Sequence, residues 1–247
     1  MPELSPRAPE FALRGVTKRF GHHAVLRELT FDLPAGECVL VLGENGAGKS
    51  TLLRLLAALS RPSEGELLFR GQPLRGDGAD ALRRELGVLS HETRLYPDLT
   101  ARENLRVFGT LSGVEPLRPR IEAALEQVGL AATPDVPVRV FSSGMTKRLG
   151  LARLLLSRPR VVLLDEPYAS LDAGSLGLID RLLESILRAG GTAVLVTHQF
   201  PPGVALCTRA VVLHQGTLRY NRPVAGLDAA ACAALMQEAT AAGPAAV

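Results

Sequence analysis

Four short runs of the chain are apolar at every position, which is typical of strands buried on both faces of a parallel sheet. These runs are residues 38–42, 161–164, 193–196 and 210–213. In four longer stretches the apolar residues recur every three or four positions, which is the spacing of an amphipathic helix. Those stretches are residues 49–59, 117–128, 144–156 and 175–188. The alternation of the two patterns predicts an α/β fold built on a mostly parallel sheet.

Other segments predict structure at the side of this core. Residues 11–31 carry Phe-x-Leu and Leu-x-Phe-x-Leu alternations and residues 66–71 add a short apolar run, which together predict a small antiparallel sheet. Residues 94–157 have mainly helical spacing and no buried strand, which predicts a helical insertion between two halves of the core. We expect three parts: a flexible N-terminus (1–10), the main domain (11–228, with the insertion at about 92–157) and an alanine-rich C-terminal helix or tail (229–247).

The composition is that of an ordinary globular protein and excludes few functions. The 247 residues are enough for one α/β domain with a small satellite and too few for two fused domains of this kind. Apolar residues make up 47% of the chain and charged residues 21%. The net charge is only +3 and no dense basic stripe accompanies it, so we expect no nucleic acid partner.

The cysteines and the apolar runs bear on the compartment. Cys38, Cys207 and Cys232 are far apart and form no Cys-x-x-Cys pair, which argues against a zinc site or a redox dithiol and favours a reducing compartment. Residues 1–10 lack the apolar segment of a signal peptide. The apolar runs are also far shorter than the roughly 20 residues that cross a bilayer. We therefore expect any role at a membrane to require another chain.

A glycine-rich loop joins the first buried strand to the first helix. Its sequence, Gly-Glu-Asn-Gly-Ala-Gly-Lys-Ser, fits the phosphate-binding pattern, in which backbone N–H groups, a lysine and a hydroxyl surround phosphates and Mg²⁺ (magnesium). The candidate nucleotide-binding residues are Gly43, Glu44, Asn45, Gly46, Ala47, Gly48, Lys49, Ser50 and Thr51. A glycine-rich turn without a ligand is the alternative, which the flanking strand and helix disfavour.

Two carboxylates follow the second buried strand. Asp165 is placed to hold Mg²⁺ together with Ser50, and Glu166 to polarise an attacking water as general base. Asp-Glu after an apolar strand could also be a simple polar strand end. The phosphate-binding loop elsewhere in the chain makes the catalytic interpretation the better one.

A third motif identifies a family. Phe-Ser-Ser-Gly-Met at 141–145, followed by a helical segment, resembles the signature motif of the ATP-binding cassette of ABC proteins, and the resemblance extends over about residues 11–224. It implies a P-loop NTPase fold (RecA-like, mostly parallel sheet) with a small antiparallel β subdomain and a helical signature-motif subdomain. It also implies that Ser142, Ser143 and Gly144 contact the γ-phosphate of ATP bound by a second cassette. Taken alone, this segment could be a simple helix cap.

The resemblance assigns roles to further residues. Asp172, in Tyr-Ala-Ser-Leu-Asp, matches the acidic residue of a loop that crosses the cassette dimer, and His198 matches the histidine that contacts the γ-phosphate. Phe20 matches the aromatic residue that stacks on adenine. The alternatives are a surface histidine and a core phenylalanine. Where the family usually has a catalytic-site glutamine this chain has His91, and Met145 replaces the last glutamine of the signature. We nevertheless expect ATPase activity.

The resemblance also implies a function. We expect an ATP-hydrolysing subunit of a membrane transporter, a peripheral protein on the cytoplasmic face of the cell membrane that works as a pair of cassettes. Separately encoded integral membrane subunits would dock near Leu95, Tyr96 and Leu99, although these residues could instead only cap the insertion. Loop sequences such as Tyr-Pro-Asp-Leu-Thr-Ala-Arg-Glu-Asn-Leu look most like export cassettes, in particular the haem-exporter ATPase of cytochrome c maturation.

The main rival is a soluble ABC ATPase of cofactor assembly, for example of iron-sulfur clusters, without a membrane partner. Chromosome and repair ATPases of the family are less compatible, because they insert long coiled coils where Lys49 and Ser142 are only 93 positions apart. A cassette that binds ATP without turnover is disfavoured by Glu166 and His198.

Overall fold

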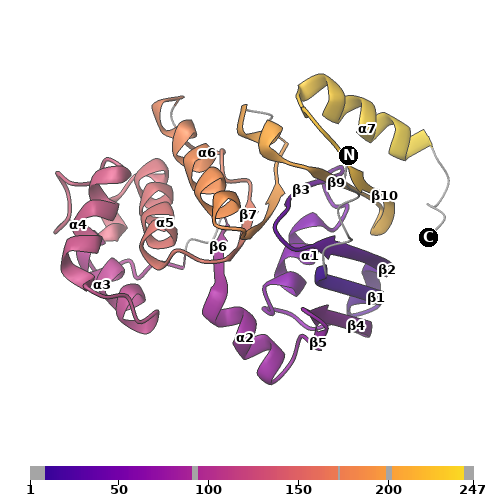
Figure 1. Cartoon of the computed structure of the whole chain (residues 1–247), viewed down its shortest axis with the longest axis horizontal. Helices are drawn as coiled ribbons and strands as arrows, with labels where there is room; N and C mark the ends of the chain where they lie inside the picture. Colours follow the sequence, from indigo (N-terminus) through magenta and orange to yellow (C-terminus); the bar gives the residue numbers. More distant parts are fainter. Residues whose placement is uncertain (1–8, 91–93, 172, 199–201, 242–247) are drawn as a thin grey trace.

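The computed structural model describes residues 9–90, 94–171, 173–198 and 202–241. A six-stranded sheet with the order β10-β9-β3-β8-β7-β6 forms its centre, and only the edge strand β10 is antiparallel to its neighbour (Figure 1). The strands are β3 (Cys38–Leu42), β6 (Leu86–Leu89), β7 (Val161–Asp165), β8 (Thr192–Val196), β9 (Arg209–His214) and β10 (Thr217–Pro223). The four predicted core strands are confirmed, and β6 and β10 extend the sheet on either side.

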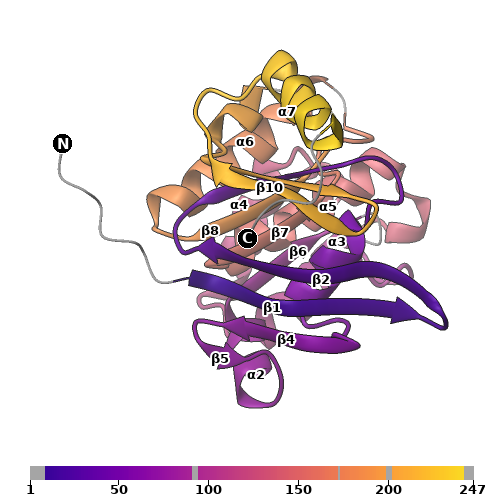
Figure 2. The ribbon, with the colours of Figure 1, turned by 90° about the vertical axis from the view of Figure 1, so that its right-hand side faces the viewer.

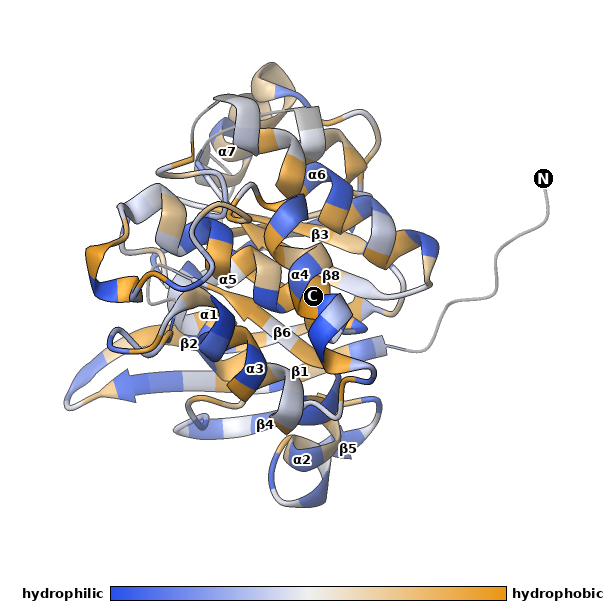
Figure 3. Ribbon diagram, turned by 90° about the vertical axis from the view of Figure 1, so that its left-hand side faces the viewer, coloured by the Kyte–Doolittle hydropathy of each residue, from blue (hydrophilic) through white to orange (hydrophobic). Residues whose placement is uncertain are grey.

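The burial of β3 explains why its sequence is apolar at every position. Cys38, Leu40 and Leu42 point into one hydrophobic cluster, and Val39 and Val41 point into a second cluster on the other face of the sheet. Alternate side chains of a strand face opposite sides, so a strand covered on both faces needs apolar residues throughout. In Figure 3 the strands of this sheet are mainly in the hydrophobic colour.

A second, antiparallel sheet covers one face of the first, beside helix α1 (Lys49–Leu56) (Figure 2). Its strand order is β2-β1-β4-β5. The strands are β1 (Pro9–Phe20), β2 (His23–Pro34), β4 (Glu64–Phe69) and β5 (Gln72–Pro73). This is the small antiparallel sheet that the alternating patterns predict.

The helical insertion lies at one end of the molecule (Figure 1). It contains α3 (Ala101–Leu111), α4 (Leu117–Gln127), the short 3-10 helix Val138–Val140 and α5 (Ser143–Ser157). A capping box begins α3, because the Thr100 side chain accepts from the Glu103 amide while Glu103 accepts from the Thr100 amide. Helix α5 also connects β6 to β7, so it belongs both to the insertion and to the crossover of the parallel sheet.

Among the described residues, three further helices lie against the two sheets. They are α2 (Asp77–Glu85), α6 (Ala173–Arg188) and α7 (Ala229–Ala241), and a 3-10 helix spans Pro202–Leu206. Helix α2 is absent from the sequence prediction, because it is short and mostly polar and its buried face offers only Gly78, Ala79 and Leu82. Helix α1 ends three residues earlier than predicted, just before Ala58 takes a left-handed φ of 53°.

Among the described residues, no helix is both long and apolar enough to cross a membrane. The α/β P-loop architecture with its antiparallel and helical subdomains agrees with the predicted fold class. The predicted domain limits remain a prediction.

Candidate nucleotide-binding site

An open cleft of about 370 Å³ lies at the carboxyl ends of β3, β7 and β8. In open α/β sheets, ligands usually bind at this edge, outside the carboxyl ends of the strands. The cleft is lined by Val25, Asn45, Gly46, Gly48, Lys49, Ser50, Thr51, Asp165, Glu166, Val196 and His198. The structure therefore brings together the phosphate-binding loop, the two carboxylates and the histidine that the sequence analysis selects from three distant segments.

Glycines of the loop are required by the close approach of other strands. Gly43 has φ 149°, and a Cβ there would lie 2.3 Å from the carbonyl oxygen of Leu213. Gly48 has φ 99°, and a Cβ there would lie 2.5 Å from Cδ2 of Leu26 in β2. Side chains at these two positions would therefore displace the loop from its place between β9 and β2.

The Lys49 side chain folds back over the loop. Its ammonium donates to the carbonyl oxygens of Gly43 at 2.7 Å and Glu44 at 2.9 Å. Burial lowers the pKa of Lys49 below its ordinary value, whereas the negative charges of Glu166 and Asp165 act in the opposite direction. A cation in this position suits the terminal phosphates of a nucleotide.

Glu166 and His198 form a pair across the cleft. His198 Nδ1 lies 2.9 Å from one carboxylate oxygen of Glu166, and the His198 amide donates to the other at 3.3 Å. The Glu166 side chain is only 12% exposed, whereas that of His198 is 70% exposed. Their strands are adjacent, since Asp165 is in register with Val196, and this register places the two residues together.

Ser50 and Asp165 offer the oxygen ligands that Mg²⁺ prefers. Both line the cleft and also a smaller adjoining cavity of about 140 Å³. Mg²⁺ is usually held by one or two carboxylates and a hydroxyl, with phosphates and waters completing its coordination. The hydroxyl and the carboxylate fit that ion, and they lie where the phosphates of a bound nucleotide would complete the set. No cluster of three or more His, Cys, Asp or Glu residues suited to a metal occurs in the described ranges.

The signature residues lie apart from the cleft of their own chain. Ser142 caps α5, and its hydroxyl accepts from the Met145 amide at 3.2 Å. Ser143 is the first residue of the helix, and a Cβ at Gly144 would lie 3.1 Å from the carbonyl oxygen of Ser170. The Ser142 hydroxyl thus performs the simple capping role in this structure. None of the three residues lines the cleft described above.

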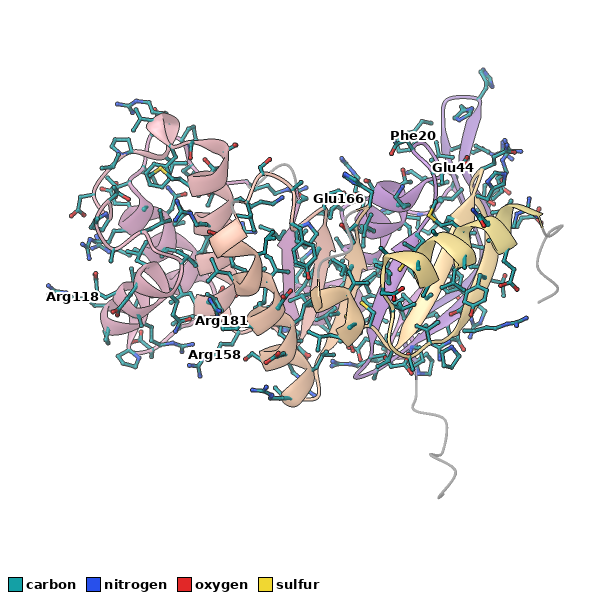
Figure 4. All side chains as sticks on the ribbon, turned by 90° about the horizontal axis from the view of Figure 1, so that it is seen from above. Phe20, Glu44, Arg118, Arg158, Glu166 and Arg181 are labelled. Atoms are coloured by element: carbon teal, nitrogen blue, oxygen red, sulfur yellow. The ribbon has the colours of Figure 1, made fainter. Side chains whose placement is uncertain are left out.

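Phe20 is on the surface at the end of β1 and is 55% exposed, which excludes the core alternative. The Lys18 ammonium lies 5.1 Å from the centre of its ring. Figure 4 shows Phe20, Glu44 and Glu166 along the same side of the molecule, away from Arg158 and Arg181. His91 and Asp172, which the sequence analysis also selects, lie outside the described residues.

The proposed docking residues follow β6 at the start of the insertion. Tyr96 is exposed, and Leu95 and Leu99 are half-buried. The Tyr96 ring stacks on Phe108 at 5.9 Å between centres, and the guanidinium of Arg153 in α5 lies 4.8 Å from the centre of the Phe108 ring. Leu95 packs against the core, so capping of the insertion accounts for part of this segment.

Sequence reasoning missed several residues of this region. Val25 and Val196 line the cleft, and Val196 could have been found from its position at the carboxyl end of a core strand. Lys147 follows the signature residues and Asn104 lies in the Tyr-Pro-Asp-Leu-Thr-Ala-Arg-Glu-Asn-Leu segment, but neither is predicted as a site residue, because only the fold shows what they contact. Lys147 donates to the backbone carbonyl of Glu166, and Asn104 bonds to the backbone of the docking segment.

Comparisons with known proteins identify the family of this chain. A family model described as "ABC transporter" matches residues 26–169. An aliphatic sulfonates import ATP-binding protein of Rhodopseudomonas palustris is 40% identical over 86% of this chain and 73% of its own length. A cytochrome c biogenesis ATP-binding export protein of Salmonella typhi is 42% identical over 78% of this chain and 91% of its own length.

A solved structure gives the same result for the fold. It is a dimeric ATP-binding cassette in a post-hydrolysis state bound to ADP and phosphate, 27% identical, with a TM-score of 0.78 over 88% of this chain and 100% of that one. The family model covers more than half of the chain, and both relatives align over most of their length. The chain therefore belongs to the ABC transporter family, as one of its ATP-binding, ATP-hydrolysing cassettes.

Proposed function

We propose that this chain powers an exporter, as a peripheral protein on the cytoplasmic face of the membrane, through ATP-driven association of two copies. The observation that carries the pairing is the division of the site between two surfaces. Lys49, Glu166 and His198 meet in one cleft, whereas the start of α5 at Ser142 does not line it. A head-to-tail pair would bring the start of α5 from one copy onto the ATP of the other, where its free N–H groups suit a phosphate.

In this proposal each residue of the cleft has one task. The Lys49 ammonium exchanges its two carbonyl partners for the terminal phosphates, and the loop amides hold the remaining oxygens. Glu166 accepts the proton of the attacking water, and His198 holds the carboxylate in position. Phe20 stacks on adenine from the β1–β2 turn. Bound at Ser50 and Asp165, Mg²⁺ would neutralise phosphate charge.

The membrane subunits are proposed to dock at the segment around Leu95, Tyr96 and Leu99. The support is an exposed tyrosine, Tyr96, that stacks on Phe108, and Phe108 in turn lies against Arg153 of the helix that carries the signature. The adjoining cavity, lined by Leu53 and Leu59 among others, shares Ser50 and Asp165 with the nucleotide cleft. A helix seated there would lie beside the phosphates, which gives hydrolysis a short route to the membrane partner.

The first experiment uses Glu166→Gln, which should bind ATP but not hydrolyse it. We expect the purified variant to form a pair on a sizing column with ATP and to stay single without it. From detergent-solubilised native membranes, the tagged variant with ATP should capture small multi-span proteins. Capture of soluble proteins alone would favour the cofactor-assembly alternative. A variant that stays single at millimolar ATP would contradict the proposed pairing.

A second experiment addresses the cargo. We propose haem export in cytochrome c maturation, supported by the 42% identity to the Salmonella typhi export protein. Import of aliphatic sulfonates is the rival function, because the sulfonate import protein is 40% identical to this chain. The chain would be expressed in a strain lacking the cytochrome c biogenesis protein and in one lacking the sulfonate importer subunit. Recovery of covalent haem on c-type cytochromes is expected, whereas recovery of growth on aliphatic sulfonates alone would overturn both cargo and direction.

A further inference from the structure

Lys147 is a buried cation that the proposed mechanism leaves without a role. It lies in the second turn of α5, and only 6% of it is exposed. Its ammonium donates to the backbone carbonyl of Glu166 at 2.5 Å and to that of Ala169 at 2.7 Å. Burial lowers the pKa of Lys147, and the charges of Glu166 and Asp165 oppose that shift. Burying a lysine is costly unless it is well bonded, so these contacts fix its position.

The backbone that Lys147 holds is strained. Glu166 has φ 49° and Ser170 has φ 64°, which are left-handed values that residues other than glycine adopt at a cost of about 1–3 kcal/mol. The strained turn runs from Glu166 to Ser170. The two carbonyls to which Lys147 donates, those of Glu166 and Ala169, lie at its start and just before its end. Because the Glu166 amide donates to Val196 at 2.8 Å, the peptide groups on both sides of its Cα are fixed. The direction of the Glu166 carboxylate therefore depends on Lys147.

The same helix carries the signature residues at its beginning. Ser142 and Lys147 are five positions apart, which is about 7.5 Å along a helix at 1.5 Å per residue. A Cβ at Gly144 would lie 3.1 Å from the Ser170 carbonyl, so the start of α5 also packs against the strained turn. A shift of α5 would consequently be felt at Glu166, because both contacts link rigid elements.

We propose that Lys147 is a positioning residue that couples the signature surface of a chain to the general base of the same chain. The proposal rests on the head-to-tail pairing proposed above. There, the signature residues of one copy contact ATP in the first site, while Glu166 of that copy serves the second site. ATP in the first site would then align the base in the second through α5 and Lys147, which makes hydrolysis cooperative in ATP.

The test compares Lys147→Met, Lys147→Arg and a matched control, Arg148→Met. Met keeps the length of the side chain without the charge, whereas Arg can again donate to two carbonyls. Arg148 is the next residue of α5 and donates to the Val128 carbonyl at 3.5 Å, so it controls for loss of a cation on this helix. Hydrolysis is measured against ATP concentration, with affinity for a fluorescent ATP analogue and the unfolding temperature measured separately.

We expect Lys147→Met to lower kcat about 10- to 100-fold, which is the usual effect of a slightly misplaced catalytic group. Its Hill coefficient should fall to about one, with nucleotide affinity within about threefold of the wild type. Lys147→Arg should recover most of kcat and cooperativity, and Arg148→Met should retain both. Wild-type kcat and Hill coefficient in Lys147→Met would overturn the proposal.

A purely structural role of Lys147 would give a different pattern in the same measurements. In that case affinity, kcat and the unfolding temperature would fall together and Lys147→Arg would restore none of them, which likewise overturns the proposal. Failure of the pairing is read separately, from Glu166→Gln remaining single with ATP. That outcome would remove the coupling between sites, whereas an unchanged kcat in Lys147→Met would refute the positioning of Glu166 whether or not the copies pair.

Discussion

Asn104, in the first turn of α3, allows a sharp test of how the docking segment is held. Its side chain is completely buried. The amide oxygen accepts from the Tyr96 backbone N–H at 2.8 Å, and the amide nitrogen donates to the carbonyls of Tyr96, Leu99 and Thr100 at 3.0, 3.2 and 3.0 Å. One side chain thus satisfies a whole turn of backbone, and we expect Asn104→Ala to loosen that turn.

The expected loss of folding stability in Asn104→Ala follows from the hydrogen bonds that the substitution removes. The Tyr96 N–H loses its acceptor, and leaving a buried donor unpaired costs about 1–3 kcal/mol. The two amide hydrogens are worth about 0.5–1.5 kcal/mol each. The carbonyls of Tyr96 and Leu99 keep other partners, the amides of Leu99 and Val138, at 3.3 and 3.0 Å. Because water can enter near the surface, we expect a loss of about 2–4 kcal/mol, toward the lower end of the total.

Thermal unfolding measures this loss. In a domain of this size each kcal/mol lowers Tm by about 2–4 °C, so Asn104→Ala should unfold about 4–16 °C below the wild type. Thr110→Ala, an exposed change on the same helix, is the control and should stay within about 0.5 kcal/mol. A shift below 2 °C in Asn104→Ala would refute the role assigned to the amide.

Asn104→Asp distinguishes hydrogen bonding from packing. Its shape is nearly unchanged, but a carboxylate would face three carbonyl oxygens and could donate to none. Burial raises the pKa of such a carboxyl, so its neutral form is favoured by folding. Stability would then be lost as pH rises through that raised pKa, and the deficit at pH 7 should shrink as pH falls toward 5. A deficit that is independent of pH would contradict this account.

Further predictions concern the cleft and the thiols. Glu166→Gln should lower kcat for ATP at least about 100-fold with little change in nucleotide affinity, and an unchanged rate would exclude Glu166 as the base. Gly48→Ala should weaken binding of a fluorescent ATP analogue more than tenfold, because its methyl group would meet Leu26, and wild-type affinity would show that the loop can adjust. Burial, with a smaller contribution from Asp228, raises the pKa of Cys232 to about 11. Its alkylation by iodoacetamide at pH 8.5 should therefore be slow in the native protein and fast in urea, and equal rates would refute its burial.

The sequence predicted the parts of the fold that depend on local pattern. Fully apolar runs located β3, β7, β8 and β9, because burial on both faces leaves no room for polar residues. Helix α2 is not predicted because it is short and mostly polar, and its buried face holds only two small residues and one leucine. Edge strand β10 is half-buried, and its mixed sequence resembles a loop.

Only some residues of the candidate site can likewise be predicted from local sequence. Residues tied to a motif, such as Lys49 and Glu166, are predicted by the sequence alone, and they line one cleft. Asn104 and Lys147 are not, because each acts on backbone groups that lie far away until the chain folds. The replacement of a family glutamine by His91 is visible in the sequence, but its consequence depends on residues 91–93, which lie outside the described ranges.

The position of β3 in the large sheet has a consequence for synthesis of the chain. Strand β3 ends at residue 42, but its two partners are β8 and β9, which begin about 150 residues later. At a translation rate of about 5–20 residues per second, β3 waits roughly 8–30 s before either neighbour exists. During that time a fully apolar strand has both edges open, which favours aggregation. A nascent chain of this protein should therefore depend on chaperones, and a truncation before residue 192 should remove the partners of β3 and with them the sheet around the phosphate-binding loop.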